Sequence, residues 1–230
     1  MEEIKLNAKG EWIPPKSIWN RMFLGIFIAN FVMNTAVKMS NASLQLYAKD
    51  LGAPADEIGV LMSMFAITAL IFRFIAGPTM NAFNRKIIVM CAMAGFSLVY
   101  LGYAMSPVIA GALGMEIIDV LKFFRLLQGI ANAFGNACCM AVVADVLPKE
   151  NFSTGMGIYG CTTILANAFG PAIGSAARKS IGVVNTYFVT VAIMIFAIIC
   201  MTQVKVAPRE KVPFKVTPKN MIAKEALLPP

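Results

Sequence analysis

The sequence contains no histidine. Histidine is the commonest metal ligand and the commonest general base, so sites of both kinds lose their main residue. Glycine-rich phosphate and dinucleotide motifs are also lacking. The cysteines show no zinc or redox spacing and stand at positions 91, 138, 139, 161 and 200. The chain is therefore not expected to be an enzyme, and it offers no catalytic residue, no metal site and no cofactor site.

Charged residues are scarce as well, at 14% of the chain against 58% hydrophobic residues. A soluble domain carries about 25% charged residues. Six apolar runs reach the roughly 20 residues that a membrane-spanning helix needs. They do not alternate with polar residues, which favours helices over barrel strands. The sequence thus predicts an all-α membrane protein with six transmembrane helices, at about residues 19–46, 58–80, 87–106, 117–147, 156–177 and 182–201.

The basic residues predict the topology. Of the 20 Lys and Arg residues, 13 lie before or at the very start of the first span or after the second, fourth and sixth. An even number of spans places these segments on one side, and basic loops mark the cytoplasmic side. Both termini of a multi-pass plasma-membrane protein are therefore expected in the cytoplasm. The net charge of +8 reflects this topology, and no nucleic-acid partner is expected.

Three parts follow from this reading. Residues 1–17 are a cytoplasmic N-terminal segment, residues 18–201 the transmembrane bundle, and residues 202–230 a basic, proline-containing cytoplasmic linker. The first span is expected to be retained, because its polar lead is long for a signal peptide and five further spans follow.

A polar stripe runs along the first span. At 100° per residue, its members share an arc of about 80°, and they are Asn30, Asn34, Lys38, Asn41 and Gln45. Polar residues within a membrane face protein or a water-filled cavity rather than lipid. We expect Asn30, Asn34 and Lys38 to line a cavity. Two alternatives stay open: Lys38 extends to the outer surface, and the two asparagines hydrogen-bond a neighbouring helix.

The fourth span carries a second stripe of about 80°, formed by Arg125, Gln128, Asn132 and Asn136. Arg125 lies about 12 Å along the helix, and no acid stands three or four residues from it. A buried unpaired guanidinium is costly, so its partner must come from another helix, water or a ligand. All four residues are predicted to line the cavity, while structural pairing and substrate contact both stay open for Arg125.

The acidic residues lie near helix ends. Asp56 and Glu57 begin the second span and Glu116 begins the fourth, where the helix dipole favours negative charge. Asp119 is placed to pair with Lys122. Because no acid is left in mid-membrane, the cavity is expected to be electropositive.

The fifth span carries small residues at alternating spacings of three and four: Gly160, Thr163, Asn167, Gly170, Gly174 and Ala177. Such a stripe lets two helix backbones approach closely. Pro171 removes one helical hydrogen bond and favours a bend. Close packing is expected, and a bend that alternates between two conformations is the other reading.

Three motifs in these spans resemble the N-terminal half of a major facilitator superfamily transporter. The first is the family pattern Gly-x-Leu-Ala-Asp-Arg-x-Gly-Arg-Arg/Lys, within RFIAGPTMNAFNRK at residues 73–86. Gly77, Arg85 and Lys86 match it, whereas Asn81 stands where the family has an acid. Gly77 is expected to allow close helix packing. The predicted cytoplasmic gating loop consists of Arg73, Gly77, Asn81, Arg85 and Lys86.

The other two motifs lie in the fourth and fifth spans. The pattern Arg-x-x-Gln-Gly is matched by Arg125, Gln128 and Gly129. The pattern Gly-x-x-x-Gly-Pro-x-x-Gly-Gly is read here as Ala166, Gly170, Pro171, Gly174 and Ser175. Its predicted helix-bend residues are Ala166, Gly170, Pro171 and Gly174.

The resemblance implies a secondary active transporter in which two six-helix bundles rock around a central site. The fifth-span motif implies proton-coupled export of a small organic molecule or drug. A carrier for anionic metabolites is the alternative, because the cavity is basic. A non-transporting membrane scaffold or sensor is an alternative of another class.

The resemblance also implies a latch at Asn81. In the family, the acid at this position helps to latch the two halves together. Asn accepts a hydrogen bond at a helix N-terminus but carries no charge, so we expect a weaker latch.

A single bundle cannot rock against itself, and residues 205–230 resemble the central cytoplasmic linker of the family. The chain is thus expected to end before a seventh helix. A second six-helix bundle is an expected partner, either as a missing C-terminal half or as a second copy. The other expected partners are a small-molecule substrate, protons and the lipid bilayer.

Overall fold

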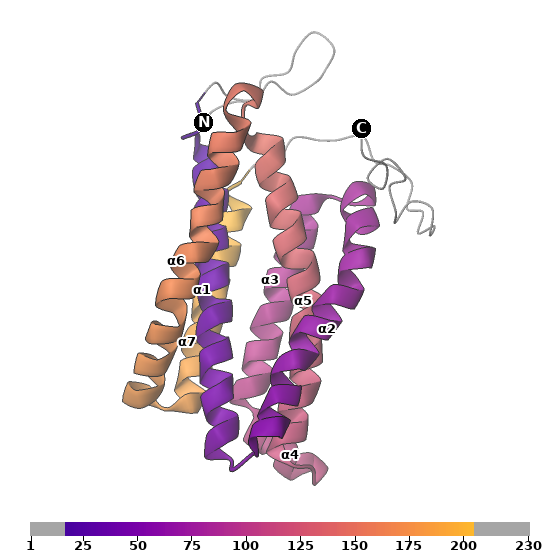
Figure 1. Ribbon diagram of the computed structural model, residues 1–230, viewed down its shortest axis with the longest axis vertical. Coiled ribbons are helices and arrows are strands. Elements are labelled where there is room, and N and C mark those ends of the chain that lie inside the picture. The colour runs from indigo at the N-terminus through magenta and orange to yellow at the C-terminus, as the bar shows by residue number, and fades with distance from the viewer. Residues whose placement is uncertain (1–16, 205–230) are drawn as a thin grey trace.

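The computed structural model describes residues 17–204. In this part of the chain, six long helices form one elongated bundle, and one short helix, α4, lies at one end of the bundle (Figure 1). They are α1 (Arg21–Asp50), α2 (Ala55–Ala82), α3 (Arg85–Ala104), the short α4 (Ser106–Leu113), α5 (Ile117–Val146), α6 (Phe152–Ile181) and α7 (Val183–Thr202). A 3-10 turn, η1 (Lys149–Asn151), precedes α6. The predicted terminal segments 1–17 and 202–230 lie almost wholly outside the described residues.

Each predicted span is a helix, and five helices are long and apolar enough to cross a membrane: α1, α2, α3, α5 and α7. The fifth predicted span corresponds to α6, which has 30 residues. It is not one of the five, so its crossing stays a prediction. The sequence analysis missed α4, a new helix directly after the end of α3 that has Pro107 in its first turn.

Short junctions join the long helices. The side chain of Asn20 caps α1 by accepting a hydrogen bond of 2.8 Å from the Phe23 amide. Asn84 caps α3 in the same way, accepting a bond of 3.0 Å from the Lys86 amide. Between α6 and α7 stands a single residue, Gly182, with φ at 82°. Glycine adopts this conformation without the steric cost that a Cβ brings.

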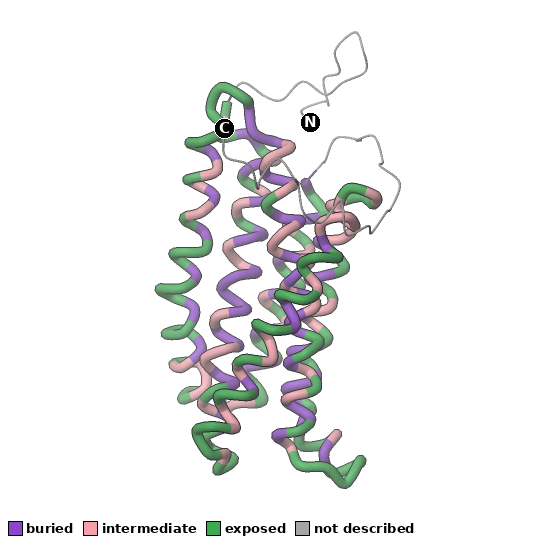
Figure 2. Tube along the Cα trace, turned by 45° about the vertical axis from the view of Figure 1, so that its right-hand side comes forward, coloured by how far each residue is buried: buried purple, intermediate pink, exposed green. Residues whose placement is uncertain are grey.

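The helices pack in two neighbourhoods. α1 lies along α6 and α7, while α5 lies along α2 and α3, and α3 also packs on α7. α1 contacts α2 and α5 much less. Buried positions face the inside of the bundle and exposed positions run along the outside (Figure 2). Many of these exposed side chains are large and apolar, as expected for a surface that meets lipid.

Close contact between α1 and α6 depends on two glycines. A Cβ at Gly174 would lie 2.6 Å from the carbonyl oxygen of Met39, and one at Gly170 would lie 2.6 Å from the Lys38 Cβ. The prediction of close packing is therefore confirmed at Gly170 and Gly174.

Three other residues of the predicted stripe lie outside the face of α6 that packs within residues 17–204. Thr163 and Asn167 are exposed, and a Cβ at Gly160 would meet no described atom within 4 Å. The buried side of α6 instead carries Tyr159 and Thr162. A spacing of three and four fits several neighbouring stripes on one helix, so the spacing alone does not identify the packed one.

Adding one methyl group to a glycine of α6 should distinguish the face that packs on α1 from the face that does not. Gly174→Ala should lower the free energy of unfolding by about 1–3 kcal/mol, because α1 and α6 must move apart. Gly160→Ala should be neutral or raise stability by up to about 1 kcal/mol, because alanine is the better helix former. Thermal unfolding in detergent measures both, and equal effects would contradict the close α1–α6 contact.

Candidate functional site

Arg125 lies inside the bundle, only 2% exposed. Its Nη1 donates hydrogen bonds of 2.7 Å to Asn41 Oδ1 on α1 and of 2.7 Å to Gln128 Oε1 on α5. Its Nη2 lies 3.3 Å from Met62 Sδ, and the guanidinium stands 4.7 Å from the centre of the Phe65 ring, both on α2. No carboxylate of residues 17–204 pairs with it. Neutral groups from three helices therefore surround this charge.

Gln128 is fully buried and links two other residues to Arg125. Its Oε1 also accepts a hydrogen bond of 2.9 Å from Tyr103 Oη on α3. Its Nε2 lies 3.5 Å from Asn41 Oδ1. The next residue, Gly129, brings α2 close, since a Cβ there would lie 2.7 Å from the Phe65 carbonyl oxygen. All three residues of the Arg-x-x-Gln-Gly motif thus take part in helix contacts.

The two inner asparagines of α1, Asn30 and Asn34, are buried, and Asn30 contacts α6. Asn30 donates a hydrogen bond of 2.6 Å from Nδ2 to Thr162 Oγ1. Asn34 Nδ2 lies 2.9 Å from the Asn30 carbonyl oxygen and 3.0 Å from Asn30 Oδ1. The contact with Thr162 is of the helix–helix kind that the sequence left open. Lys38 is half-buried, and no described acid pairs with it.

The outlying residues of the α5 stripe are more open. Asn132 and Asn136 are half-buried, and Asn136 donates a hydrogen bond of 2.7 Å to Asn132 Oδ1. The stripes of α1 and α5 meet where Arg125 and Gln128 contact Asn41. Asn41 belonged to the predicted polar arc on the first span but not to the predicted site. Helical angles show which residues share a face, but they do not show which of these residues contacts another helix.

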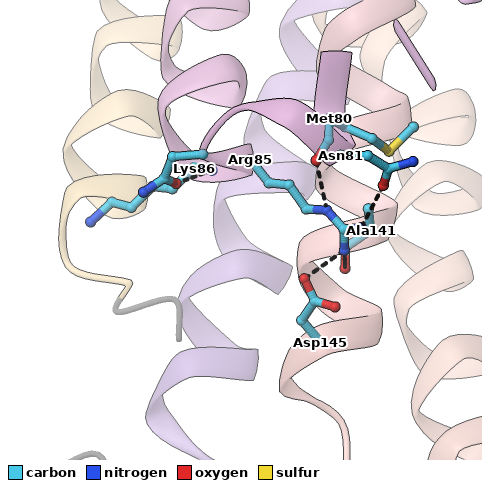
Figure 3. A network of polar contacts seen from close by, with 7 residues as sticks. Met80, Asn81, Arg85, Lys86, Ala141 and Asp145 are labelled. Carbon is cyan, nitrogen blue, oxygen red and sulfur yellow. Dashed lines mark hydrogen bonds and ion pairs between the residues drawn. The ribbon is translucent and has the colours of Figure 1, made fainter. Parts of the chain in front are cut away.

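The predicted gating loop centres on Arg85, which binds groups on α2 and α5 (Figure 3). Its Nη1 lies 2.6 Å from Asp145 Oδ2 and 3.3 Å from the Ala141 carbonyl oxygen on α5. Its Nε donates to the Met80 carbonyl oxygen at 3.2 Å, and its Nη2 to Asn81 Oδ1 at 3.3 Å. Sequence reasoning missed Asp145. The available signal was that Asp145 is an acid at the end of an apolar span. That position does not identify its partner Arg85, which is 60 residues away in the sequence.

Asn81 differs from its predicted setting. It lies in the last turn of α2, and its oxygen accepts the hydrogen bond from Arg85 rather than one from a helix N-terminus in the described chain. The N-terminal cap of α3 is Asn84. A Cβ at Gly77 would meet no described atom within 4 Å, so close packing at Gly77 is not found among residues 17–204. Arg73 is exposed.

Lys86 connects the α2–α3 junction to the end of α7. Its Nζ donates hydrogen bonds of 2.8 Å to the Thr202 carbonyl oxygen and of 2.6 Å to the Val204 carbonyl oxygen. A cation at a helix C-terminus satisfies unpaired carbonyls and interacts favourably with the helix dipole. The final basic residue of the first motif therefore anchors the last helix of the bundle.

Ion pairs also lie at the opposite end of the bundle. Lys122 Nζ is 2.6 Å from Glu57 on α2 and 3.1 Å from Asp119 on its own helix. The predicted Asp119–Lys122 pair is thus confirmed, and Glu57 joins α2 to α5. Arg178 on α6 pairs with Asp50 on α1.

In the fifth-span motif, Ala166 is buried beside the two packed glycines. Pro171 is exposed and lies inside a helix assigned continuously from Phe152 to Ile181. A bend that changes between two conformations stays a prediction.

An apolar groove of about 320 Å³ lies between α3 and α5, away from this polar site. Its lining carries only apolar side chains and one glycine, among them Leu98, Phe124 and Phe134. It has no polar group that would orient a polar substrate, so the Arg125 region is the candidate site.

Comparisons with known proteins agree on one family. The sequence model of the Major Facilitator Superfamily matches residues 26–229. The staphylopine export protein of Staphylococcus aureus is 25% identical over 180 residues, covering 78% of this chain and 41% of its own length. A multi-drug resistance efflux pump, PmrA of Streptococcus pneumoniae, is 25% identical over 181 residues, covering 76% of this chain and 42% of its own.

A solved structure has the same fold. The crystal structure of a D-xylose-proton symporter matches with a TM-score of 0.62 at 14% identity, covering 84% of this chain and 49% of that one. The chain thus spans about two fifths of the length of these two curated relatives. The family and these relatives are transporters and not enzymes, as the sequence predicts.

Breaking the pair between Arg85 and Asp145 should loosen the α3–α5 contact. Asp145→Asn leaves a partly buried guanidinium without its carboxylate, so we expect the free energy of unfolding to fall by about 1–3 kcal/mol. Glu150→Gln is the matched control, because Glu150 is exposed at the same end of α5. Unfolding in detergent measures both, and losses of the same size would show that the ion pair contributes nothing specific.

Proposed function

The chain belongs to the Major Facilitator Superfamily, and on that basis we propose that the whole protein is a secondary active transporter. It exports a small organic molecule or drug, in exchange for protons, by alternating access. The export protein, the efflux pump and the proton symporter named above support this proposal. Family membership and the apolar helices make the chain an integral membrane protein.

The observation that carries the proposal is the setting of Arg125. A guanidinium that is 2% exposed within a transmembrane helix, with only neutral described partners, carries a large electrostatic cost. A purely structural contact is stabilised better by a buried carboxylate or by an apolar residue. Arg125 therefore keeps a charge available to a substrate or to an acid in another part of the protein. Asn34, Lys38, Asn132 and Asn136 complete the proposed cavity.

A second six-helix bundle is the proposed partner. Glycines on α2 and α6 have no described atom within 4 Å of the position of a Cβ: Gly59, Gly77, Gly157 and Gly160. In a membrane protein such small residues mark faces where another helix approaches closely. The chain spans about two fifths of the length of these relatives, which agrees with a further bundle in the whole protein.

We assign the end with the α2–α3 junction to the cytoplasm. The start of α1 and the end of α7 lie at this same end, since a Cβ at Gly25 would lie 2.9 Å from Val204 (Figure 1). Arg21, Arg85 and Lys86 gather there, which is the charge bias of a cytoplasmic face. The plasma membrane is the proposed location.

A carrier for anionic metabolites is the second candidate. It is favoured by Lys38 and Arg125, which have no described carboxylate partner. Such cations attract an anion in a low-dielectric cavity.

Transport by the full-length protein in proteoliposomes with an imposed pH gradient tests both candidates. Ethidium and tetracycline serve as drug-like probes, and radiolabelled citrate serves as an anionic probe. Proton-driven export of a drug-like probe supports the first candidate. Transport of citrate alone supports the second. Transport of no probe and no proton movement would favour a non-transporting scaffold or sensor and would reject both.

Removing the charge of Arg125 should lower the transport rate far more than removing the charge of an exposed lysine. Arg125→Gln should lower the transport rate about tenfold or more, as expected for loss of a charge-assisted contact. Lys179→Gln is the control, because Lys179 is exposed near the end of α6 and loses the same charge. Rates that are the same for the two variants would contradict the proposed role of Arg125.

Restoring the acid at position 81 should change the preferred state. Asn81→Asp places a carboxylate beside Arg85, and through the family's latch it should favour the outward-open state. Labelling of a cysteine introduced at the cytoplasmic end should then slow by about threefold or more. Asn84→Asp, at the cap of α3, controls for added charge alone. Unchanged labelling in Asn81→Asp would reject the latch.

A further inference from the structure

Tyr103 is a buried residue outside the predicted site, and its hydroxyl contacts Gln128 of that site. It is 1% exposed on α3. Its hydroxyl donates to Gln128 Oε1 at 2.9 Å, and the same oxygen accepts from Arg125 Nη1 at 2.7 Å. One amide oxygen thus joins a phenol on α3 to the guanidinium on α5.

We propose that Tyr103 is a positioning residue for Arg125, acting through the amide of Gln128. An amide has an acceptor side and a donor side, and its orientation follows from its partners. Here two donors face Oε1, while Nε2 points toward Asn41 Oδ1 at 3.5 Å. A reversed amide would direct an N–H group at the guanidinium, which has no acceptor, whereas the phenol oxygen can accept as well as donate. Arg125 therefore sets the acceptor orientation of Gln128, and the Tyr103 hydroxyl holds the Gln128 oxygen in the place where it accepts from Arg125.

This orientation matters because Arg125 has no described carboxylate partner. Two side-chain oxygens accept from it, on Asn41 and Gln128. Arg125 Nε already has no hydrogen-bond partner among the described residues, so the loss of either oxygen leaves a further N–H group unpaired in a low-dielectric interior. The site of Arg125 thus depends on a hydroxyl of another helix, α3, that binds the Gln128 oxygen.

The neighbouring Tyr187 provides a matched control. It is fully buried on α7, and its ring centre lies 5.3 Å from that of Tyr103. Its hydroxyl has no hydrogen-bond partner among residues 17–204. Tyr103→Phe and Tyr187→Phe therefore remove the same atom from the same aromatic cluster, and only the first removes a contact to Gln128.

The experiment measures the rate at which phenylglyoxal modifies Arg125 in the full-length protein. Mass spectrometry of the peptide that contains Arg125 quantifies the modification. Because Arg125 is 2% exposed, the unaltered protein should react slowly there. Tyr103→Phe should raise the rate at Arg125 about fivefold, and Tyr187→Phe by less than about twofold. Equal rates in the two variants, whether raised or unchanged, overturn the proposal.

A second variant tests the route through Gln128. Gln128→Glu gives Arg125 a carboxylate, so its modification should become slower than in the unaltered protein. In that background, Tyr103→Phe should no longer raise the rate. A rate increase in the double variant equal to that of Tyr103→Phe alone would show that the tyrosine does not act through residue 128. If Tyr103→Phe does not fold, an unchanged rate in Gln128→Glu alone overturns the proposal.

The importance of this positioning for transport rests on the proposed function. Tyr103→Phe should raise the KM for the exported probe by about fivefold, with a smaller change in kcat, while Tyr187→Phe should leave both unchanged. A lack of transport in the unaltered protein would reject the proposed function, and the modification rates would still decide the role of Tyr103. A KM equal in the two variants, in a protein that transports, would reject the link to the substrate site.

Discussion

The charge of Arg125 inside an apolar bundle is the constraint on which the site depends. Water does not solvate it there, and its described partners are the oxygens of Asn41 and Gln128, the sulfur of Met62 and the ring of Phe65. These groups come from α1, α2 and α5. Since α1 otherwise contacts α2 and α5 sparsely, the guanidinium links α1 to these two helices, while the packing of α3 on α7 is the larger contact between the two neighbourhoods.

Each neighbourhood is joined by its own contacts. α2 and α5 meet in the Glu57–Lys122 ion pair at one end, and Arg85 binds both α2 and Asp145 at the other. α1 and α6 meet at Gly170 and Gly174 and in the pair between Arg178 and Asp50. The ion pairs thus lie near helix ends, where water lowers the cost of charge. The middle of the bundle relies on small residues and neutral hydrogen bonds.

Sequence patterns predicted the six helices, the burial of Arg125 and its lack of a local acid, because these follow from hydropathy and from spacing within one helix. Asp145, Tyr103 and the partner of Glu57 could not be found that way. Each acts through a residue on another helix, and a helical angle gives no information on the neighbouring helix. The same limit applies to the stripe on α6, where Gly170 packs on α1 and Asn167 is exposed in the described chain. The spacing alone does not show which face α1 covers.

The single-residue junction at Gly182 constrains how the bundle deforms. With α6 ending at Ile181 and α7 beginning at Val183, the adjoining ends of these helices cannot slide past each other by more than one residue's reach. α6 packs on α1 through glycine contacts and α7 packs on α3. A shift of α6 along its axis must therefore carry the adjoining end of α7 with it, and α7 ends at the carbonyls that Lys86 binds. Movement at one end of the bundle is thus geometrically tied to the opposite end through the continuous helix α7 rather than through a loop.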